Sequence, residues 1–414
     1  MEEDLITPQD WKPTVATIKV LGVGGGGCNA VNYMYEQGID GCSFFVCNTD
    51  SMHLTGCSVP QKIQLGRGLG AGTNPTDGRN AALESQDEIA AKVFDGRTEM
   101  LFITAGMGGG TGTGATPVIA KMAKDRGILT VAVVTIPFIN EGKKALSRAI
   151  DGLHELEKNV DSLIIINNQR LYDYYGNLLI QDAFPKADEV LATAVRGIVD
   201  IIKHRGYINV DFKDVLTMMK DSGLGLMGCG TGSGPDRIKT AVKEAFKSPL
   251  LNDFDLKSAK NVLVNITVGK NEQGLTMDEM NNLNKLIDEY TGGANNFKRG
   301  LFYDTDPAAG DTIRITSIVT GLRFNDVLGA EAKDADNYIT LDRDFVYDKG
   351  EQSKDGGILL PADNSSHIGF SSTTGERSFR YDPDKPPVLV VDDNQDIASL
   401  ENEPAIRRKT KKNE

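Results

Sequence analysis

Five short stretches in the first half of the chain are almost continuously apolar and rich in β-branched residues. Strands of a parallel sheet have this pattern because helices cover both faces of the sheet, whereas a half-exposed strand alternates apolar and polar residues. Stretches with helical periodicity, such as 116–124, separate them. The pattern predicts a doubly wound, Rossmann-like α/β domain over residues 14–185. Its strands are expected at 16–23, 43–48, 100–104, 129–136 and 162–167.

A long helical pattern follows over residues 186–206. Its apolar positions form a band wider than the single stripe of a surface helix, which predicts a central helix buried between two domains. Residues 207–324 then combine strand-like runs with helical patterns, which predicts a second, α+β domain packed against that helix. The strand-like runs are 262–267 and 312–320, and the helical patterns are 236–245 and 277–290.

The character of the chain changes after residue 324, where Asp, Gly, Ser and Pro dominate and apolar pieces are short. We predict a disordered, acidic linker over 325–402. The last segment, 403–414, reverses the sign of the charge with EPAIRRKTKK and is either a solvated tail or a docking peptide. We predict that residues 1–13 form a flexible N-terminus.

Composition narrows the class of protein. The 414 residues carry a net charge of −13, which argues against nucleic acid as a partner. The acidic start MEEDLITPQDW does not resemble a secretory signal, and no apolar run approaches the roughly 18 residues of a membrane span, so we expect a cytoplasmic protein without direct membrane insertion. The five cysteines lack metal-ligand spacing, and we expect reduced thiols and no protein-held metal site.

Two glycine-rich segments each follow a predicted strand and precede a predicted helix. In GVGGGGCNA (22–30), Gly22, Gly24 and Gly27 fit the dinucleotide fingerprint, although a tight turn without a ligand is the alternative. In GMGGGTGTG (106–114), six of nine residues are glycine. At the ends of parallel strands, both segments would direct helix N-termini at one sheet edge, which suits a polyphosphate. Neither contains the lysine of a P-loop, so backbone N–H groups, threonine hydroxyls and Mg²⁺ would offset the phosphate charge.

Neither glycine segment contains a group that could activate water. The segment NVDFKDV (209–215) places Asp211 and Asp214 three residues apart, just before a helical pattern. This spacing is typical of a helix cap, with Asp211 at the N-cap and Asp214 at the third helical position. On spacing alone, capping is the preferred interpretation of the two acids.

Taken together, the motifs resemble those of the tubulin/FtsZ superfamily of GTPases, including the cell-division proteins of bacteria. GMGGGTGTGA resembles the superfamily's signature loop. The other matching motifs occur in the family's order between about residues 14 and 324. They are GVGGGGCNA, CNTD (47–50), GAGTNPTDGRNAA (70–82), PFINEGKKA (137–145), INVDFKDV (208–215) and SPLLNDFDL (248–256).

The resemblance implies a site for GTP or GDP with Mg²⁺. Phe184 would stack on guanine, Asn168 and Asp188 would read its edge, and Glu141 would bind the ribose. An arginine is usual in the family where this chain has Ala145, and Arg148 lies one turn later. The phosphates and the adjoining wall of the site would be held by Gly24, Gly25, Gly26, Gly27, Cys28, Asn29, Asn48, Gly70, Ala71, Gly72, Thr73, Gly106, Gly108, Gly109, Gly110, Thr111, Gly112, Thr113, Pro137 and Arg148.

The resemblance also implies that each site is completed by a neighbouring copy. Asp211 and Asp214 of one subunit would orient the attacking water over the nucleotide of the next, with Asn209 positioning the loop. The homopolymer would grow head to tail into filaments of the septal ring, beneath the inner membrane. Residues 403–414 resemble the peptide by which this family docks on membrane-tethering and division-regulating proteins.

Two other functions are compatible with some of these motifs. An NAD(P)-dependent oxidoreductase would use Gly22, Gly24 and Gly27 with Asp50, but it leaves the 106–114 segment unexplained. A GTP-binding scaffold that copolymerises without hydrolysis would not need Asp211 and Asp214, both of which are present.

Overall fold

The computed structural model describes residues 17–169, 180–203, 206–208, 210–247, 256–269, 274–293, 296–304 and 310–322, together with four short strands nearer the C-terminus. Of residues 180–187 only the backbone is described. The chain divides into two compact units, Met1–Val327 and Leu328–Glu414, and each is described by itself.

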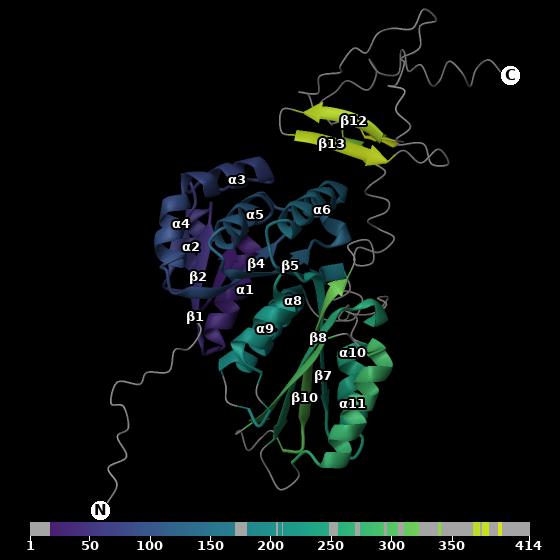
Figure 1. The fold of residues 1–414 in the computed structure, drawn as a ribbon. Helices are drawn as coiled ribbons and strands as arrows, with labels where there is room; N and C mark the ends of the chain where they lie inside the picture. The colour runs from purple at the N-terminus through teal and green to yellow at the C-terminus, as the bar shows by residue number, and fades with distance from the viewer. Residues whose placement is uncertain are drawn as a thin grey trace, which may run out of the picture. The chain divides into compact units, whose positions relative to one another are not determined.

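A ten-stranded sheet runs through the first unit in the order β3-β2-β1-β4-β5-β6-β7-β10-β8-β9 (Figure 1). Neighbours from β3 to β7 pair in parallel, β10 is antiparallel to β7 and β8, and β8 pairs in parallel with β9. The predicted parallel sheet is confirmed, and it continues into the second half of the unit through β6 and β7. The strands are β1 (Thr17–Val23), β2 (Cys42–Asn48), β3 (Lys62–Gln64), β4 (Thr98–Gly106), β5 (Leu129–Ile136), β6 (Ser162–Asn167), β7 (Gly223–Gly232), β8 (Asn261–Gly269), β9 (Asn296–Asp304) and β10 (Ile313–Leu322).

The inner strands are buried on both faces. In β4, the consecutive side chains Met100, Leu101, Phe102 and Ile103 are all 0% exposed although they point alternately to opposite faces. Helices therefore cover both faces, which is why these strands appear in the sequence as unbroken apolar runs. The sequence pattern did not predict β3, β7 or β9.

Helices α1 to α6 accompany the parallel strands, and α10 and α11 pack in the second half of the unit (Figure 1). Two helices start earlier than expected, because α1 begins at Gly24 and α5 begins at Gly110, inside the segments predicted as loops. The bounds are α1 (Gly24–Glu36), α2 (Ser51–Gly56), α3 (Pro75–Glu84), α4 (Gln86–Val93), α5 (Gly110–Lys124), α6 (Lys143–Glu157), α8 (Ile180–Lys203), α9 (Phe212–Met219), α10 (Arg237–Phe246) and α11 (Met277–Thr291).

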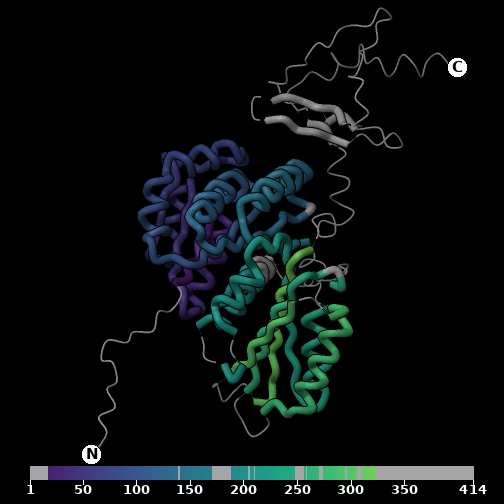
Figure 2. Tube along the Cα trace, viewed as in Figure 1, coloured from purple at the N-terminus to yellow at the C-terminus, as the bar shows by residue number. Residues whose placement is uncertain are grey.

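Helix α8 lies between the two halves of the first unit, as Figure 2 shows along the trace. It begins at Ile180, six residues before the predicted start at 186. Its buried residues Val195 and Val199 belong to the same core cluster as Val20 of β1 and Ile318 of β10. The helix therefore contributes to the packing of both halves, as its wide apolar band predicts.

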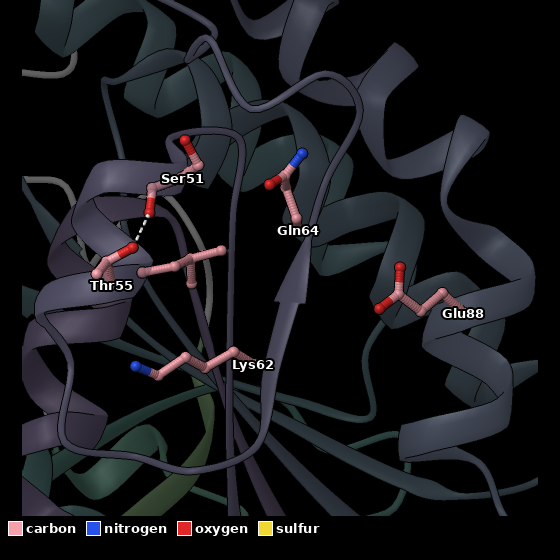
Figure 3. A pocket seen from close by; sticks show the side chains of 6 residues that line it. Ser51, Thr55, Lys62, Gln64 and Glu88 are labelled. Carbon is pink, nitrogen blue, oxygen red and sulfur yellow. Dashed lines mark hydrogen bonds between the residues drawn. The ribbon is translucent and has the colours of Figure 1, made fainter.

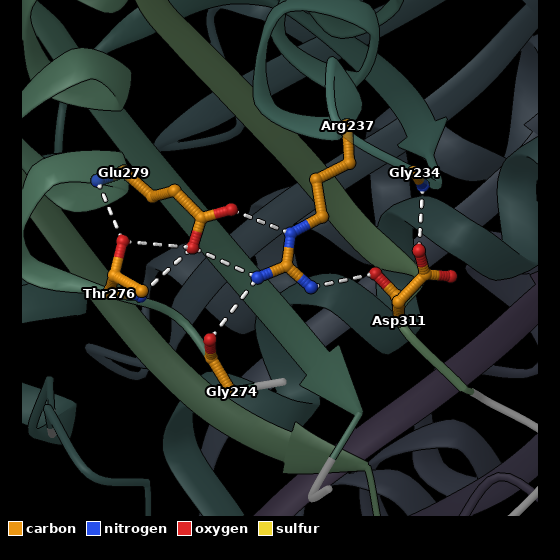
Figure 4. Close-up of polar contacts among 6 residues, drawn as sticks. All are labelled: Gly234, Arg237, Gly274, Thr276, Glu279 and Asp311. Carbon is orange, nitrogen blue, oxygen red and sulfur yellow. Dashed lines mark hydrogen bonds and ion pairs between the residues drawn. The ribbon is translucent and has the colours of Figure 1, made fainter. Parts of the chain in front are cut away.

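An ion pair joins α10 and α11, and hydrogen bonds extend it to the segment just before β10 (Figure 4). The Arg237 side chain is 6% exposed, and its Nε and Nη2 donate to the two carboxylate oxygens of Glu279 at 2.8 and 2.9 Å. Its Nη1 and Nη2 also donate to the backbone oxygens of Asp311 and Gly274. Thr276 and Glu279 form a reciprocal cap at the start of α11. These contacts hold the Arg237 guanidinium and the Glu279 carboxylate in one position relative to each other.

The described part of the second unit consists of two strand pairs. β11 (Tyr338–Thr340) pairs in parallel with β14 (Val388–Val390), and β12 (His367–Ser372) pairs antiparallel with β13 (Gly375–Arg380). These short strands fall within the predicted linker at 325–402. The predicted docking peptide at 403–414 and the N-terminal residues 1–13 lie outside the described residues.

Candidate functional site

The N-termini of α1 and α5 lie side by side at the carboxyl ends of the neighbouring parallel strands β1 and β4. A Cβ built on Gly24 would lie 2.8 Å from the backbone nitrogen of Gly112, and one on Gly26 would lie 3.3 Å from the Cα of Gly106. Neither helix has a side-chain cap or an acidic residue in its first turn. Free N–H groups of two helices are therefore directed at one edge of the sheet, which favours an anionic ligand.

Most of the glycines at this edge are explained by close contact between backbones. A Cβ on Gly27 would lie 2.2 Å from the carbonyl oxygen of Thr104, and one on Gly112 would lie 2.3 Å from that of Gly106. Gly24 and Gly108 have φ of +71° and +99°, which disfavour any side chain. The protein therefore requires these glycines for its own packing, whether or not a ligand binds.

Gly25 and Gly109 differ from these closely packed glycines. A Cβ on Gly109 would meet no protein atom within 4 Å, and one on Gly25 would meet only the His53 ring at 3.8 Å. Gly109 has a φ of −83°, which any residue can adopt. Because packing does not explain these two glycines, the space next to them fits a bound group that approaches the backbone closely.

A third segment, 70–73, closes against the start of α5. A Cβ on Gly110 would lie within 2.9 Å of three carbonyl oxygens, those of Ala71, Gly72 and Asn74. Gly70 and Gly72 have φ of +84° and +55°, and Gly72 and Thr73 are exposed. The predicted phosphate-site residues of segment 70–73 therefore lie against the start of α5, within the glycine-rich segment 106–114.

Hydrogen bonds hold the 106–113 segment in place. The hydroxyl of Thr111 shares a buried 2.6 Å hydrogen bond with that of Thr49, and the Thr113 hydroxyl accepts from the Gly108 backbone N–H at 2.8 Å. Arg148 donates from Nε to the Gly108 carbonyl oxygen at 2.8 Å, so this arginine reaches the loop from α6. The Pro137 ring packs beside Gly108.

The residues expected around the sugar and base are only partly described. Glu141 accepts from the Phe138 backbone N–H at 2.9 Å within a short 3-10 turn. Asn168 has a buried side-chain oxygen without a hydrogen-bond partner. Burial raises the pKa of Asp188 to about 6. The side chain of Phe184 lies outside the described residues.

Cys28, Asn29 and Asn48 complete the predicted set. The Cys28 thiol is fully buried and donates to the Cys47 carbonyl oxygen at 3.4 Å, so it faces the core and only its backbone N–H remains for a ligand. Asn29 is exposed. Asn48 is buried, and its side-chain oxygen accepts from the Asp50 backbone N–H.

The acidic pair lies elsewhere in the molecule. Asp211 and Asp214 form the reciprocal cap of α9 that their spacing predicts, with Asp214 N–H donating to Asp211 at 2.7 Å. The carboxylate of Asp214 also pairs with Lys298 of β9 at 2.7 Å. The Lys298 ammonium is the largest cause of the lowered pKa of Asp214. Asn209 lies outside the described residues.

The strand order separates the acidic pair from the glycine segments. Lys298 belongs to β9 at one edge of the sheet, and Gly106 ends β4, six strand positions away. At about 4.8 Å per strand, this separation amounts to tens of ångströms. In Figure 1, α9 correspondingly lies below α3, α5 and α6. The acids of a subunit therefore do not face its own glycine segments.

An open hollow of about 440 Å³ lies beside α2, β3 and α4 (Figure 3). It contains none of the predicted site residues. No group of three or more His, Cys, Asp or Glu side chains in the described part of the chain could hold a metal ion. The hollow is lined by Ser51, Leu54, Thr55, Lys62, Gln64 and Glu88.

Sequence reasoning missed two partners in this arrangement. Thr49 lies in the CNTD motif, but nothing in its spacing indicated a bond to Thr111. Lys298 lies far from Asp214 in the sequence. Its strand β9 bridges Ile208 through Leu301, which brings Lys298 beside the acidic loop formed by 210–214.

Two family models match the chain. The model described as the Tubulin/FtsZ family, GTPase domain, matches residues 17–176, and that of the FtsZ family, C-terminal domain, matches residues 223–323. The cell division protein FtsZ of Porphyromonas gingivalis is 46% identical over 73% of this chain and 66% of its own length. That of Pseudomonas aeruginosa is 47% identical over 74% of this chain and 77% of its own length.

The solved structures agree with these matches. An FtsZ dimer structure from M. jannaschii covers 77% of this chain and 92% of its own, at 38% identity and a TM-score of 0.69. The NAD(P)-dependent oxidoreductase is thereby excluded. The chain belongs to the FtsZ family of cell-division proteins, the tubulin-like GTPases.

Proposed function

We propose that this protein binds GTP at the edge where α1 and α5 begin and hydrolyses it when the acidic loop of a second copy covers that edge. Each copy then supplies a nucleotide site at one end and an acidic loop at the other. Such a contact is heterologous and does not close on itself, so the same contact that completes the site extends a filament.

The observation that carries this proposal is the separation of the acids from the glycine segments within one subunit. Asp214 pairs with Lys298 of β9 and is bonded to Asp211 in the cap of α9, while the open helix N-termini follow β1 and β4. Water activation directly over a bound triphosphate therefore requires the acids of another copy.

The described residues fit the phosphates of a nucleotide. Backbone N–H groups at the starts of α1 and α5 would hold the phosphate oxygens, and Gly25 and Gly109 leave the space that these oxygens need. Arg148 and Thr113 would keep the loop in shape through Gly108. Bound Mg²⁺ would neutralise part of the negative charge on the phosphates.

The other end of the site fits guanosine. The unpartnered Asn168 oxygen and the half-buried carboxylate of Asp188 would accept from the N–H groups on the guanine edge. Glu141 would accept from ribose hydroxyls. Phe184 would stack on the base.

The two acids would act by orientation. Phosphoryl transfer to water proceeds through a loose transition state, so the attacking water must above all be held in line. Asp214 has a lowered pKa and stays ionised, which suits a hydrogen-bond acceptor better than a strong base. Asp211 would accept from the same water, and Asn209 would help to position the loop.

Phosphate release at increasing protein concentration tests this proposal. We expect turnover per subunit to rise steeply above a critical concentration, because only assembled copies have complete sites. Asp214→Asn should keep GTP affinity and lose at least about 100-fold in turnover. Asp278→Asn, an exposed acid on α11, serves as the matched control. Full activity in a dilute monomer would contradict the proposal, whereas polymer with normal GTP affinity and no phosphate release would indicate the non-hydrolysing scaffold.

We further propose that residues 403–414 bind membrane-tethering and division-regulating proteins, and that 325–402 is the tether between them and the filament at the division site beneath the inner membrane. The basic residues next to Pro404, Ala405 and Ile406 support this assignment. Deletion of 403–414 should leave GTP turnover unchanged and abolish capture of these partners. The helices in the described ranges include none with the length and apolar character of a transmembrane span.

A further inference from the structure

Lys298 occupies a defined position beside the acidic loop. Its Nζ lies 2.7 Å from Oδ1 of Asp214, and the two side chains are 47% and 30% exposed. The next residue, Arg299, contacts Asn284 of α11 on the opposite face of β9. Within this pair of neighbouring cations, Lys298 is therefore the one that faces the loop.

Strand β9 holds the loop at two points. The backbone N–H of Tyr207 donates to Leu301 at 2.7 Å, and that of Leu301 donates to Ile208 at 3.0 Å, which fixes the entry to the loop. The Lys298 ammonium fixes the other end through Asp214. In the cap, the Asp211 N–H reaches only Oδ2 of Asp214, at 3.3 Å. The cap alone therefore leaves the Asp214 carboxylate able to change its orientation, and the ion pair with Lys298 prevents this.

We propose that Lys298 is a positioning residue for GTP hydrolysis, which holds the Asp214 carboxylate in one orientation through their ion pair. This inference rests on the proposed function, in which Asp214 orients the attacking water. Lys298 acts through Asp214 and does not itself touch the water. Removal of its ammonium should therefore change the rate of the chemical step and leave GTP binding alone.

The charges around Asp214 give this role a pH signature. Among the described residues, the charged groups that face Asp214 are Lys298 from β9 and Asp211 from the loop. Lys298 stabilises the ionised form of Asp214, so its loss raises the pKa of that carboxyl. The acid limb of the turnover profile should then move to higher pH.

The test compares Lys298→Met, Lys298→Arg and the control Lys239→Met, an exposed lysine of α10. Turnover is measured per sedimented subunit, so that a change in assembly does not enter the rate. We expect Lys298→Met to lower kcat about tenfold, leave KM for GTP within twofold and shift the acid limb upward in pH. Lys298→Arg should restore most of kcat, and Lys239→Met should resemble the unmodified protein.

A double variant separates this inference from the proposed function. If Lys298 acts through Asp214, Lys298→Met should change the residual rate of Asp214→Asn less than twofold. Unchanged kcat and pH profile in Lys298→Met, while Asp214→Asn is inactive, would overturn the positioning role alone. Full activity of Asp214→Asn would instead overturn the proposed function.

Discussion

At the scale of single residues, the glycines of the two segments serve two purposes. Gly27, Gly110 and Gly112 allow backbones to approach more closely than a Cβ permits. Gly25 and Gly109 meet no such limit within the protein, so the reason for glycine lies in what binds next to them. The two groups of glycines cannot be told apart from the motif, and only the backbone atoms around each glycine distinguish them.

Gly109→Ser tests the second group. The new Cβ meets no protein atom, and Gly109 is the N-cap of α5, where serine is a favourable residue. We expect the thermal stability of the nucleotide-free protein to be unchanged or higher. GTP affinity, measured by isothermal titration, should fall at least about tenfold because the side chain occupies the phosphate space and competes for the same N–H groups. Unchanged affinity would show that no phosphate lies beside Gly109.

The protonation of Asp188 should make GTP binding depend on pH. Burial raises its pKa to about 6, so the carboxylate is ionised at pH 7 and mostly protonated at pH 5. A protonated carboxyl cannot accept from both guanine N–H donors, and affinity should fall about tenfold over this range. Asp188→Asn should bind more weakly and lose this dependence. Protonation of the GTP phosphates affects the unmodified protein and Asp188→Asn equally. If GTP affinity depends on pH in the same way for both proteins, Asp188 does not contact guanine.

At the scale of elements, the apolar runs predicted β1, β2, β4, β5 and β6 closely because burial on both faces leaves a strong pattern. Apolar runs did not predict β7 or β9. The β7 sequence GLGLMGCGTG is glycine-rich, and the β9 sequence NFKRGLFYD mixes polar with apolar residues. Helices α1 and α5 begin at glycines that have low helix propensity, because the packing of their N-termini on neighbouring backbone overrides it. Propensity could not show this, since the contacts come from distant segments.

The ion pair between Arg237 and Glu279 links three elements, and its contribution to stability should depend on pH. Arg237 holds the pKa of Glu279 at about 2, well below its usual 4.5. The stabilisation is therefore complete above about pH 5 and is lost as the pH falls toward 2. Glu279→Gln should lower the free energy of unfolding by about 2 kcal/mol at pH 7.

Urea unfolding at pH 7 and pH 3.5 measures this effect. The difference between Glu279→Gln and the unmodified protein should shrink at pH 3.5. At that pH Glu279 is protonated in the unfolded chain but still ionised in the folded protein, so folding of the unmodified protein must release a proton. Glu289→Gln, an exposed acid on the same helix, should have little effect at either pH. A difference that stays constant between the two pH values would contradict the lowered pKa.

At the scale of the whole molecule, one continuous sheet carries the two halves of the proposed chemistry on strands that are far apart. The sequence predicted both the glycine edge and the acidic pair as motifs. It could not supply their separation, which depends on the strand order and on the attachment of the acidic loop to β9. The same dependence explains why the sequence leaves the role of Lys298 open, since its partner Asp214 is known only once β9 is placed.

This separation leads to a prediction about mixtures. At a GTP concentration too low to occupy its weakened site, Gly109→Ser should hold no nucleotide but keep its acids. Asp214→Asn should bind GTP but lack a working acid. Each variant alone should release little phosphate. In a mixture, an Asp214→Asn subunit that holds GTP can receive the intact acidic loop of a Gly109→Ser neighbour, so the junction between them is complete.

Equal amounts of the two variants should therefore recover up to about a quarter of the normal rate, since about one junction in four has the productive order when subunits mix at random. Mixing Asp214→Asn with the double variant Gly109→Ser/Asp214→Asn is the control and should stay inactive. If the first mixture is no faster than its two components measured separately, while both variants still enter the same sedimented polymer, then the acids do not act on a neighbour's nucleotide. If phosphate release recovers in the first mixture and not in the control mixture, the working site must be shared between copies, because neither variant subunit contains a complete site.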